Sequence, residues 1–254
     1  MNHSKQRIRQ DFDRASAGYD AHASLQQCAA LQVLALAENL LPEDARVLDT
    51  GAGTGFLARH APRGWRMVQV DIAVAMCRAS SAFAPAAQAD MEVLPFRDAT
   101  FDGMISSLAL QWSEHPAATF AEAARVLKPR GTFVFATLGH TTLQELREAF
   151  AAVTGAAHGS TFPAWEELDG LLRSAGFGAV SWQEKMLREE YPDTLALMRS
   201  VKAVGAANKR EDRRQPLTKG VLAAVEEYYG ARHKTEQGGI AATWQIHYAV
   251  ARKE

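Results

Sequence analysis

Three glycines at alternate positions, Gly51, Gly53 and Gly55, follow a short apolar segment over residues 46–49 and lead into a helical pattern over 56–60. Glycine has no Cβ, so such a segment can turn sharply and bring its backbone close to a ligand. The free N–H groups at the start of the following helix lie beside the same turn. A glycine-rich turn between a strand and a helix is typical of nucleotide-binding α/β folds, although a tight turn without a ligand is an alternative.

Strands and helices alternate through the middle of the chain. The hydrophobic pattern predicts strands at 46–49, 67–71, 101–107 and 132–137, a further strand ending near residue 90, and helices at 4–18, 24–41, 56–60, 73–82 and 116–127. Pro129-Arg130-Gly131 gives a turn signal before the strand at 132–137. Strands that alternate with helices through short connections imply a parallel sheet with helices on both faces.

The alternation loosens after about residue 140. The pattern there predicts helices at 142–153, 164–175, 193–206 and 217–229, and strands at 178–187 and 243–251. We therefore expect an α/β fold with a doubly wound, mostly parallel, seven-stranded Rossmann-like sheet and a helical insertion before the last strand. We expect a single domain over 1–254, with a helical segment at 1–41, a ligand-binding half at 45–140, and a C-terminal half at 141–254 that holds the insertion at about 190–230.

Three aspartates stand where successive strands should end. A dinucleotide-binding turn would carry a third glycine at position 56, which is Phe56, and Asp49 directly before the turn would repel a pyrophosphate. Asp49 suits a cationic ligand with an amine instead, Asp71 can accept hydrogen bonds from ribose hydroxyls, and Asp90 can accept from an exocyclic adenine amine. A helix cap or a solvated loop is the commoner role for any single aspartate.

Together these residues resemble the ordered motifs of class I S-adenosylmethionine-dependent methyltransferases. The resemblance covers roughly residues 45–138 and rests on the segments 47–55, 70–71, 89–90, 101–102 and 125–131. For the last of these segments it implies a structural role. It implies that the glycine turn and Asp49 hold the methionine part of the cofactor, that Asp71 holds the ribose, and that Asp90 and Met91 hold the adenine. The full set of cofactor-binding residues that it implies is Tyr19, Asp49, Gly51, Ala52, Gly53, Gly55, Asp71, Ile72, Met76, Asp90, Met91 and Leu108, with Leu108 near the sulfonium.

A closer resemblance covers nearly the whole chain. Residues 12–20, 107–112 and 198–206 are similar to segments of the malonyl-acyl carrier protein O-methyltransferases of biotin synthesis. That family methylates the free carboxylate of a malonyl thioester on acyl carrier protein, and the methyl ester then passes through fatty-acid elongation as a neutral chain end. The resemblance implies that 1–41 is a helical lid. It implies substrate contacts from Tyr19, Gln111, Trp112, Arg199 and Lys202. This chain departs from many relatives at Ala52 in the glycine turn, where they carry cysteine.

The expected chemistry needs no general base. A malonyl carboxylate is ionised at neutral pH, since carboxyl pKa values lie near 4, so it can attack a methyl sulfonium directly. Catalysis then depends on alignment and on the exclusion of water, for which Tyr19, Arg199 and Lys202 are the candidate residues. Arg199 and Lys202 lie one helical turn apart and can neutralise the carboxylate, although a solvated basic face is the alternative. Tyr19 and Trp112 can equally be packing residues.

A basic segment near the C-terminal insertion suggests a protein partner. Lys209, Arg210, Arg213 and Arg214 can steer the docking of acyl carrier protein, which is acidic, whereas a solvated charged loop is the simpler interpretation. Nucleic acid is a poor partner, because the formal net charge is −1 and aromatic residues do not interleave with these charges. The histidines show no metal-ligand spacing, so we expect no metal.

Composition also bears on location. No run approaches the roughly 20 apolar residues that span a bilayer, and the first 16 residues lack the apolar stretch of a secretory signal. Cys28 and Cys77 stand far apart and outside any CxxC spacing, which favours reduced thiols. We therefore expect a cytoplasmic protein without a membrane partner, acting as a monomer.

Three other functions remain open at the level of the sequence. One is a methyltransferase that acts on another small carboxylic or hydrophobic metabolite. Another is a cofactor-binding partner protein without catalysis. A nicotinamide-dependent oxidoreductase is a further alternative, since the glycine turn alone does not exclude it.

Overall fold

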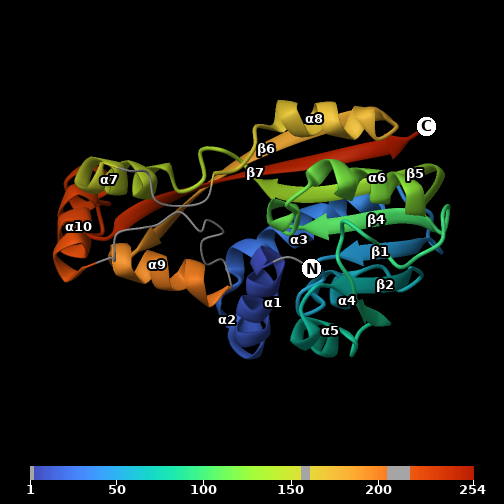
Figure 1. Ribbon diagram of the computed structural model, residues 1–254, viewed down its shortest axis with the longest axis horizontal. Coiled ribbons are helices and arrows are strands. Elements are labelled where there is room, and N and C mark those ends of the chain that lie inside the picture. The colour runs from blue at the N-terminus through green and yellow to red at the C-terminus, as the bar shows by residue number, and fades with distance from the viewer. Residues whose placement is uncertain (1–2, 156–160, 205–217) are drawn as a thin grey trace.

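A computed structural model describes residues 3–155, 161–204 and 218–254 of the chain (Figure 1). Seven strands form one sheet in the order β3-β2-β1-β4-β5-β7-β6. Their bounds are Arg46–Thr50 for β1, Arg66–Asp71 for β2, Ala86–Gln88 for β3, Phe101–Ser107 for β4, Leu127–Leu138 for β5, Phe177–Tyr191 for β6 and Ile240–Lys253 for β7. The predicted seven-stranded α/β sheet is confirmed.

All strands of the sheet run parallel except β7. β1 pairs in parallel with β2 and β4, β2 with β3, and β4 with β5. β7 lies between β5 and β6 and runs antiparallel to both. The carboxyl ends of β1, β2 and β4 therefore meet at one edge of the sheet, where the strand order reverses from descending to ascending, and α/β folds place their ligands at such an edge.

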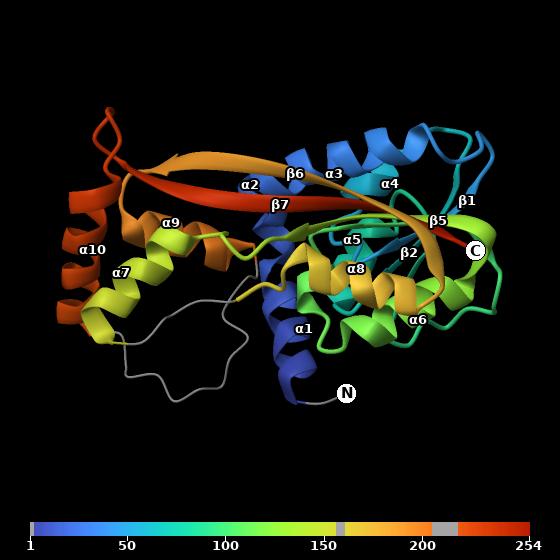
Figure 2. The ribbon, with the colours of Figure 1, turned by 90° about the horizontal axis from the view of Figure 1, so that it is seen from above.

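Helices cover both faces of the sheet. Along β5, Phe133 and Phe135 pack into one apolar cluster, while Val134 and Ala136 pack into the other, as the two-residue period of a strand requires. Figure 2 shows α3 (Ser24–Glu38) and α4 (Phe56–His60) on one side of the sheet and α6 (Pro116–Val126) and α8 (Trp165–Ser174) on the other. Helix α5 (Val74–Ser80) packs beside β2 and β3.

β6 and β7 form an antiparallel pair that extends beyond the rest of the sheet. Their pairing runs from Phe177 with Lys253 to Tyr191 with Ile240, whereas β5 pairs with β7 only as far as Ile246. The protruding end carries α7 (Gln144–Thr154), α9 (Thr194–Ala203) and α10 (Lys219–His233), which lie together at one end of the molecule (Figure 1). Since α9 and α10 follow β6 and precede β7, the predicted helical insertion before the last strand is confirmed.

The N-terminal helix is shorter than the pattern predicted. The chain forms α1 (His3–Ala15), a 3-10 turn (Ser16–Gly18) and a short α2 (Tyr19–His22), so the prediction of one helix over 4–18 is wrong at its end. The Ser16 hydroxyl donates to the carbonyl oxygen of Asp13 at 2.9 Å, a local bond that competes with the regular helical pattern. Gly18 then leaves helical geometry, with φ −116° and ψ 5°.

The turn signal before the fifth strand is a bulge inside that strand. β5 begins at Leu127, whereas the sequence predicted a start at 132. Its pairing with β4 shifts between Phe101–Leu127 and Gly103–Thr132, and Arg130 has a φ of 62°. The parallel pairing of β4 with β5 continues on both sides of this irregular segment, so the extra residues of β5 form a bulge.

Candidate active site

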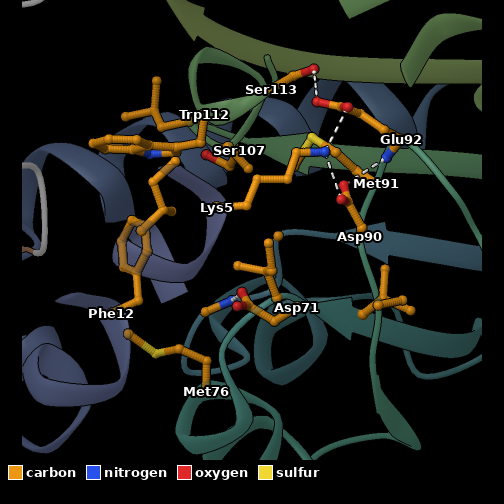
Figure 3. Close-up of a pocket in the computed structure, with 18 of the residues that line it drawn as sticks. Lys5, Phe12, Asp71, Met76, Asp90, Met91, Glu92, Ser107, Trp112 and Ser113 are labelled. Carbon is orange, nitrogen blue, oxygen red and sulfur yellow. Dashed lines mark hydrogen bonds and ion pairs between the residues drawn. The ribbon is translucent and has the colours of Figure 1, made fainter. Parts of the chain in front are cut away.

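A cavity that is partly open to solvent lies at the carboxyl ends of β1, β2 and β4 (Figure 3). The glycine turn, the end of β2 and the loop after β3 form one side, and the loop after β4 closes the next side. Helix α1 forms the remaining wall. Among the residues that the sequence implicated, Tyr19, Gly51, Gly53, Asp71, Ile72, Met76, Asp90, Met91, Leu108 and Trp112 line it.

The glycine turn is shaped by positive φ angles and by close packing. Gly51 has a φ of 71°, and a Cβ built on it would lie 2.2 Å from the Cβ of Ala109. The Gly51 N–H donates to the carbonyl oxygen of Val70 at 2.9 Å, which ties the turn to β2. Gly55 has a φ of 87°, and a Cβ there would meet Ser80 and Phe83 within 3.0 Å. The turn therefore requires glycine both for its conformation and for its close approach to the neighbouring loop.

Asp71 ends β2 and binds the backbone of the loops after β1 and β2. One of its carboxylate oxygens accepts from the Gly53 N–H at 2.9 Å, and the other accepts from the Ala73 N–H at 2.8 Å. Burial raises the pKa of this carboxyl to about 6, although these two backbone hydrogen bonds act in the opposite direction. Burial also raises the pKa of Tyr19, and the nearby Asp71 charge adds to that effect.

Asp49 lies behind the glycine turn and outside the cavity lining. Its side chain is fully buried, and neither carboxylate oxygen has a hydrogen-bond partner among the described residues. Burial raises the pKa of Asp49 well above its usual range, and the charge of Asp71 raises it further. A buried carboxylate without a donor is costly, so this position favours a cation at the adjoining turn.

The loop after β4 holds a strained residue at the cavity. Leu108 has a φ of 49°, and its N–H donates to the carbonyl oxygen of Ala136 at 2.9 Å. Gln111 donates from Nε2 to the Leu108 carbonyl oxygen at 2.7 Å. The substrate assignment would require Gln111 to line the cavity, but Gln111 is not among the lining residues. It supports Leu108, which is one of them. Non-glycine residues in this conformation cluster at functional sites, where the surrounding structure holds them in place.

Helix α1, part of the lid that the resemblance implies, contributes lining residues that the sequence did not assign to the site. Lys5, Ile8 and Phe12 line the cavity, and their spacing of three and four residues places them on one face of the helix. The ring of Phe12 meets that of Trp112 edge-on, with 5.4 Å between ring centroids. The sequence did hold a sign of this arrangement, because Lys5 lies on the same helix face as the apolar residues Ile8 and Phe12.

The loop after β3 carries a second acid that sequence reasoning missed. Glu92 accepts from the Ser113 hydroxyl at 2.9 Å and from the backbone N–H groups of Glu114 and His115 at 2.7 and 3.1 Å. The Lys5 ammonium lies 2.6 Å from a carboxylate oxygen of Glu92 and 2.6 Å from one of Asp90. Burial alone would raise the pKa of Glu92, but the hydrogen bonds from Lys5 and these neighbours lower it to about 2. Glu92 is therefore ionised at neutral pH.

Other predicted residues lie away from the cavity. Ala52 and Gly55 belong to the turn but are not among the lining residues. Arg199 and Lys202 are exposed on α9, outside the cavity, although α9 packs against α2. The positions proposed for carrier docking lie outside the described residues: Lys209, Arg210, Arg213 and Arg214.

The described ranges contain neither a metal-ligand cluster nor a membrane-spanning helix. Over 3–155, 161–204 and 218–254, no three or more His, Cys, Asp or Glu side chains are placed to hold a metal ion. In the same ranges, none of the helices is both long enough and apolar enough to cross a lipid bilayer.

Solved structures with the same fold include methyltransferases. The YcgJ protein of Bacillus subtilis superposes with a TM-score of 0.64 at 18% identity, over 88% of this chain and 99% of that one. A phosphoethanolamine N-methyltransferase of Haemonchus contortus, solved with S-adenosylhomocysteine, gives a TM-score of 0.53 at 19% identity, over 88% of this chain and 53% of that one. At these identities the likeness shows the fold.

Sequence relatives are closer. A family model described as a methyltransferase domain matches residues 48–135. The malonyl-[acyl-carrier protein] O-methyltransferase of Methylococcus capsulatus is 35% identical over 95% of this chain and 91% of its own length. That of Laribacter hongkongensis is 36% identical over 97% and 89%. The chain therefore belongs to the malonyl-acyl carrier protein O-methyltransferase family of the class I methyltransferases.

Proposed function

We propose that this protein transfers a methyl group from S-adenosylmethionine to the free carboxylate of a malonyl thioester on acyl carrier protein, giving the methyl ester that primes pimeloyl synthesis for biotin. The observation that carries the proposal is one cavity that gathers the glycine turn, Asp71, Asp90 and Leu108. These positions come from four separate loops at the switch point of the sheet. Relatives of matching length carry the name of this activity.

The residues present fit S-adenosylmethionine. Gly51 and Gly53 line the cavity without side chains, and the buried carboxylate of Asp49, without a hydrogen-bond donor among the described residues, favours a positive charge nearby. We assign the glycine turn to the methionine part, Asp71 to the ribose, and Asp90 with Met91 to the adenine. Ile72 and Met76 supply apolar contacts to the base. When bound, the cofactor supplies a methyl group on a positively charged sulfur.

The chain's task is to align and to exclude water. The acceptor carboxylate is already ionised, so an O–CH₃ bond forms as the S–CH₃ bond breaks, and no proton has to be removed. Leu108 and Trp112 present apolar groups to the reacting region, and Tyr19 adds a hydroxyl from α2. Because burial raises the pKa of Tyr19, its hydroxyl stays neutral and can donate a hydrogen bond to a carboxylate.

We assign the carrier protein to the α9 side of the molecule. Leu195, Arg199 and Lys202 are exposed at a spacing of four and three residues, so they share one face of α9. An apolar residue next to two cations suits an acidic partner with an apolar contact. The basic segment with Lys209, Arg210, Arg213 and Arg214 continues from the same helix in the sequence. Because α9 contacts α2, which contributes Tyr19 to the cavity, a carrier protein docked on α9 can deliver a thioester arm towards the cavity.

We also propose that the protein acts as a cytoplasmic monomer and that 1–254 is one domain with 1–41 as its lid. The described structure supports a reducing location, since Cys28 and Cys77 are both free thiols. α1 and α2 support the lid, because both contribute residues to the cavity.

One assay tests the activity. Purified protein is incubated with methyl-labelled S-adenosylmethionine and, in separate reactions, malonyl-acyl carrier protein, malonyl-coenzyme A or free malonate. We expect label on the carrier-bound malonyl group and a gain of about 14 Da by mass spectrometry, one methyl replacing one proton. Turnover of a small acid without methylation of malonyl-acyl carrier protein would identify a different acceptor. Cofactor binding without any methylated product would indicate a non-catalytic binding protein.

A further inference from the structure

One lysine near the N-terminal end of helix α1 ties that helix to the far side of the cavity. The Lys5 ammonium lies 2.6 Å from carboxylate oxygens of both Asp90 and Glu92, across 85 residues of sequence from the former. The Lys5 side chain is only 11% exposed and that of Glu92 only 6%. Figure 3 shows the Lys5 side chain extended from α1 towards these two acids. Ion pairs this sheltered from water are screened little by salt.

The Asp90 carboxylate binds Lys5 and is also the group that we assign to the cofactor. One oxygen of Asp90 accepts from the Glu92 N–H at 3.0 Å, and the other accepts from Lys5. Asp90 is also the residue that we assign to the adenine amine. Since each oxygen already accepts one hydrogen bond, an adenine amine must share Asp90 with Lys5 and the Glu92 N–H. The helix and the cofactor are thus joined through one side chain.

Glu92 anchors the lysine from the opposite side. Its other oxygen binds Ser113 and the N–H groups of Glu114 and His115, which follow Trp112 in the loop after β4. Lys5 consequently connects α1 to the loop after β3 and, through Glu92, to the loop after β4. These are the two loops that enclose the base end of the cavity.

We propose that Lys5 is a latch that holds α1 closed over the adenine end of the cofactor site, so that the cofactor enters and leaves only when the Lys5 ion pairs break. This proposal rests on the proposed cofactor site. Lys5 is a positioning residue, since it acts through α1 and the Asp90 carboxylate. Because α1 forms one wall of the cavity, the latch limits entry as well as exit.

A gate has a kinetic signature that a simple contact lacks. Breaking the latch by Lys5→Met lowers the barrier to both directions, so the association and dissociation rates of S-adenosylmethionine both increase. We expect an increase on the order of 10-fold in each, from the loss of charge-assisted hydrogen bonds. The Kd should change by less than either rate. Stopped-flow fluorescence, with Trp112 in the cavity as a reporter, measures both rates on the full-length protein.

Matched variants separate the latch from general effects. Arg7→Met removes the same charge from an exposed position on α1 and should leave both rates unchanged. Lys5→Arg retains a cation that can bridge two carboxylates and should restore at least part of the slow exchange. Thermal unfolding of each variant reports whether the fold is kept.

Three outcomes would overturn the latch. Unchanged rates in Lys5→Met would show that α1 does not control exchange. Slower dissociation with tighter binding would show that Lys5 competes with the adenine for Asp90. Faster dissociation with unchanged association would make Lys5 an ordinary contact. A wild-type protein that binds no S-adenosylmethionine would instead contradict the proposed cofactor site, so the two failures are distinguishable.

Discussion

The cavity has one wall built from strand ends and another built from α1, and different interactions fix the two walls. On the strand side, backbone hydrogen bonds and positive φ angles hold the glycine turn, as the bond from Gly51 to Val70 illustrates. On the α1 side, side chains make the polar attachments: Lys5 to two acids, and Asp13 to the Ala75 N–H at 2.8 Å. Short α2 adds a bond from the Thr54 hydroxyl to Asp20 at 2.5 Å.

This difference suggests a division of work. Backbone geometry inside a sheet changes only at the cost of unfolding, so the strand wall sets whether the cofactor binds at all. A helix held by a few side-chain bonds can detach while the sheet stays folded, so the α1 wall sets how fast the cofactor exchanges. Changes to the strand wall should therefore alter affinity and stability, whereas changes to the α1 wall should alter rates.

The largest effect is expected at Gly51. Gly51→Ala would place a Cβ 2.2 Å from that of Ala109, on a backbone with a φ of 71° that alanine adopts only with strain. We expect a loss of unfolding free energy of about 2 kcal/mol or more, and a Kd for S-adenosylmethionine raised more than about 100-fold, the factor that a loss of roughly 3 kcal/mol produces. Calorimetric titration and chemical denaturation measure the two quantities.

Gly170 provides the matched control for this change. It lies exposed in α8, and a Cβ there would meet nothing within 4 Å. Gly170→Ala should leave cofactor affinity unchanged and increase the unfolding free energy by up to about 1 kcal/mol, because alanine favours helix more than glycine does. Normal binding by Gly51→Ala would show that the strand wall is not set by its backbone.

The next effect concerns pH and Asp71. Its pKa is raised by burial from 3.8 to about 6, and hydrogen bonding to a ribose uses the ionised carboxylate. The Kd for S-adenosylmethionine should therefore increase about tenfold for each pH unit below 6. In Asp71→Asn the affinity should be lower and independent of pH between 5 and 7. A wild-type affinity that is constant over this range would remove Asp71 from the cofactor site.

The same shift predicts a change of stability in the opposite direction. The folded protein holds the Asp71 proton more tightly than the unfolded chain, so this residue stabilises the fold below pH 4. That contribution is lost as the pH rises through 6, by about 3 kcal/mol for a difference of roughly two pKa units. The unfolding free energy of Asp71→Asn relative to wild type should therefore increase between pH 4 and 7, as urea denaturation at several pH values would show.

The α9 face tests whether carrier docking is independent of both walls. Arg199→Glu combined with Lys202→Glu should raise the KM for malonyl-acyl carrier protein about tenfold at low salt, and less at high salt, since the attraction of an acidic partner is screened. The Kd for S-adenosylmethionine should not change, because neither residue lines the cavity. Arg63→Glu with Arg97→Glu makes the same change of charge at exposed positions elsewhere and should leave this KM unaltered. An equal loss of cofactor binding would contradict a separate docking face.

The residues of the strand wall could be predicted from the sequence, whereas for the α1 wall the resemblance implied a lid but not the residues that attach it. The glycine spacing and the acids at the strand ends are local patterns, and parallel strands bring Asp71 and Asp90 to the same edge by geometry alone. The pairing of Lys5 with Asp90 and Glu92 depends on how a separate helix docks, which no local period encodes. Arg199 and Lys202 show the same limit. Their spacing predicted a shared helix face, but not that both residues would lie outside the cavity lining.

The smallest predicted effect links the two walls through Asp13. This α1 residue accepts from the Ala75 N–H near the start of α5, and its charge raises the pKa of Asp71. Asp13→Ala removes both interactions and should cost about 1 kcal/mol of unfolding free energy, as the loss of a helix cap does. Asp13→Asn keeps an acceptor oxygen and removes only the charge, so it should preserve stability.

In both Asp13 variants the pKa of Asp71 should fall, since a neighbouring negative charge is gone. The pH at which cofactor affinity begins to decline should then move below that of the wild type, which titrations between pH 4.5 and 7 would measure. Cofactor exchange should become faster, by a few-fold, only in Asp13→Ala, because that variant alone detaches α1 from α5. Cofactor exchange in Asp13→Asn that is as fast as in Asp13→Ala would show that the charge of Asp13 holds the α1 wall. A pH profile that does not shift in either variant would show that the two walls are not coupled through Asp71.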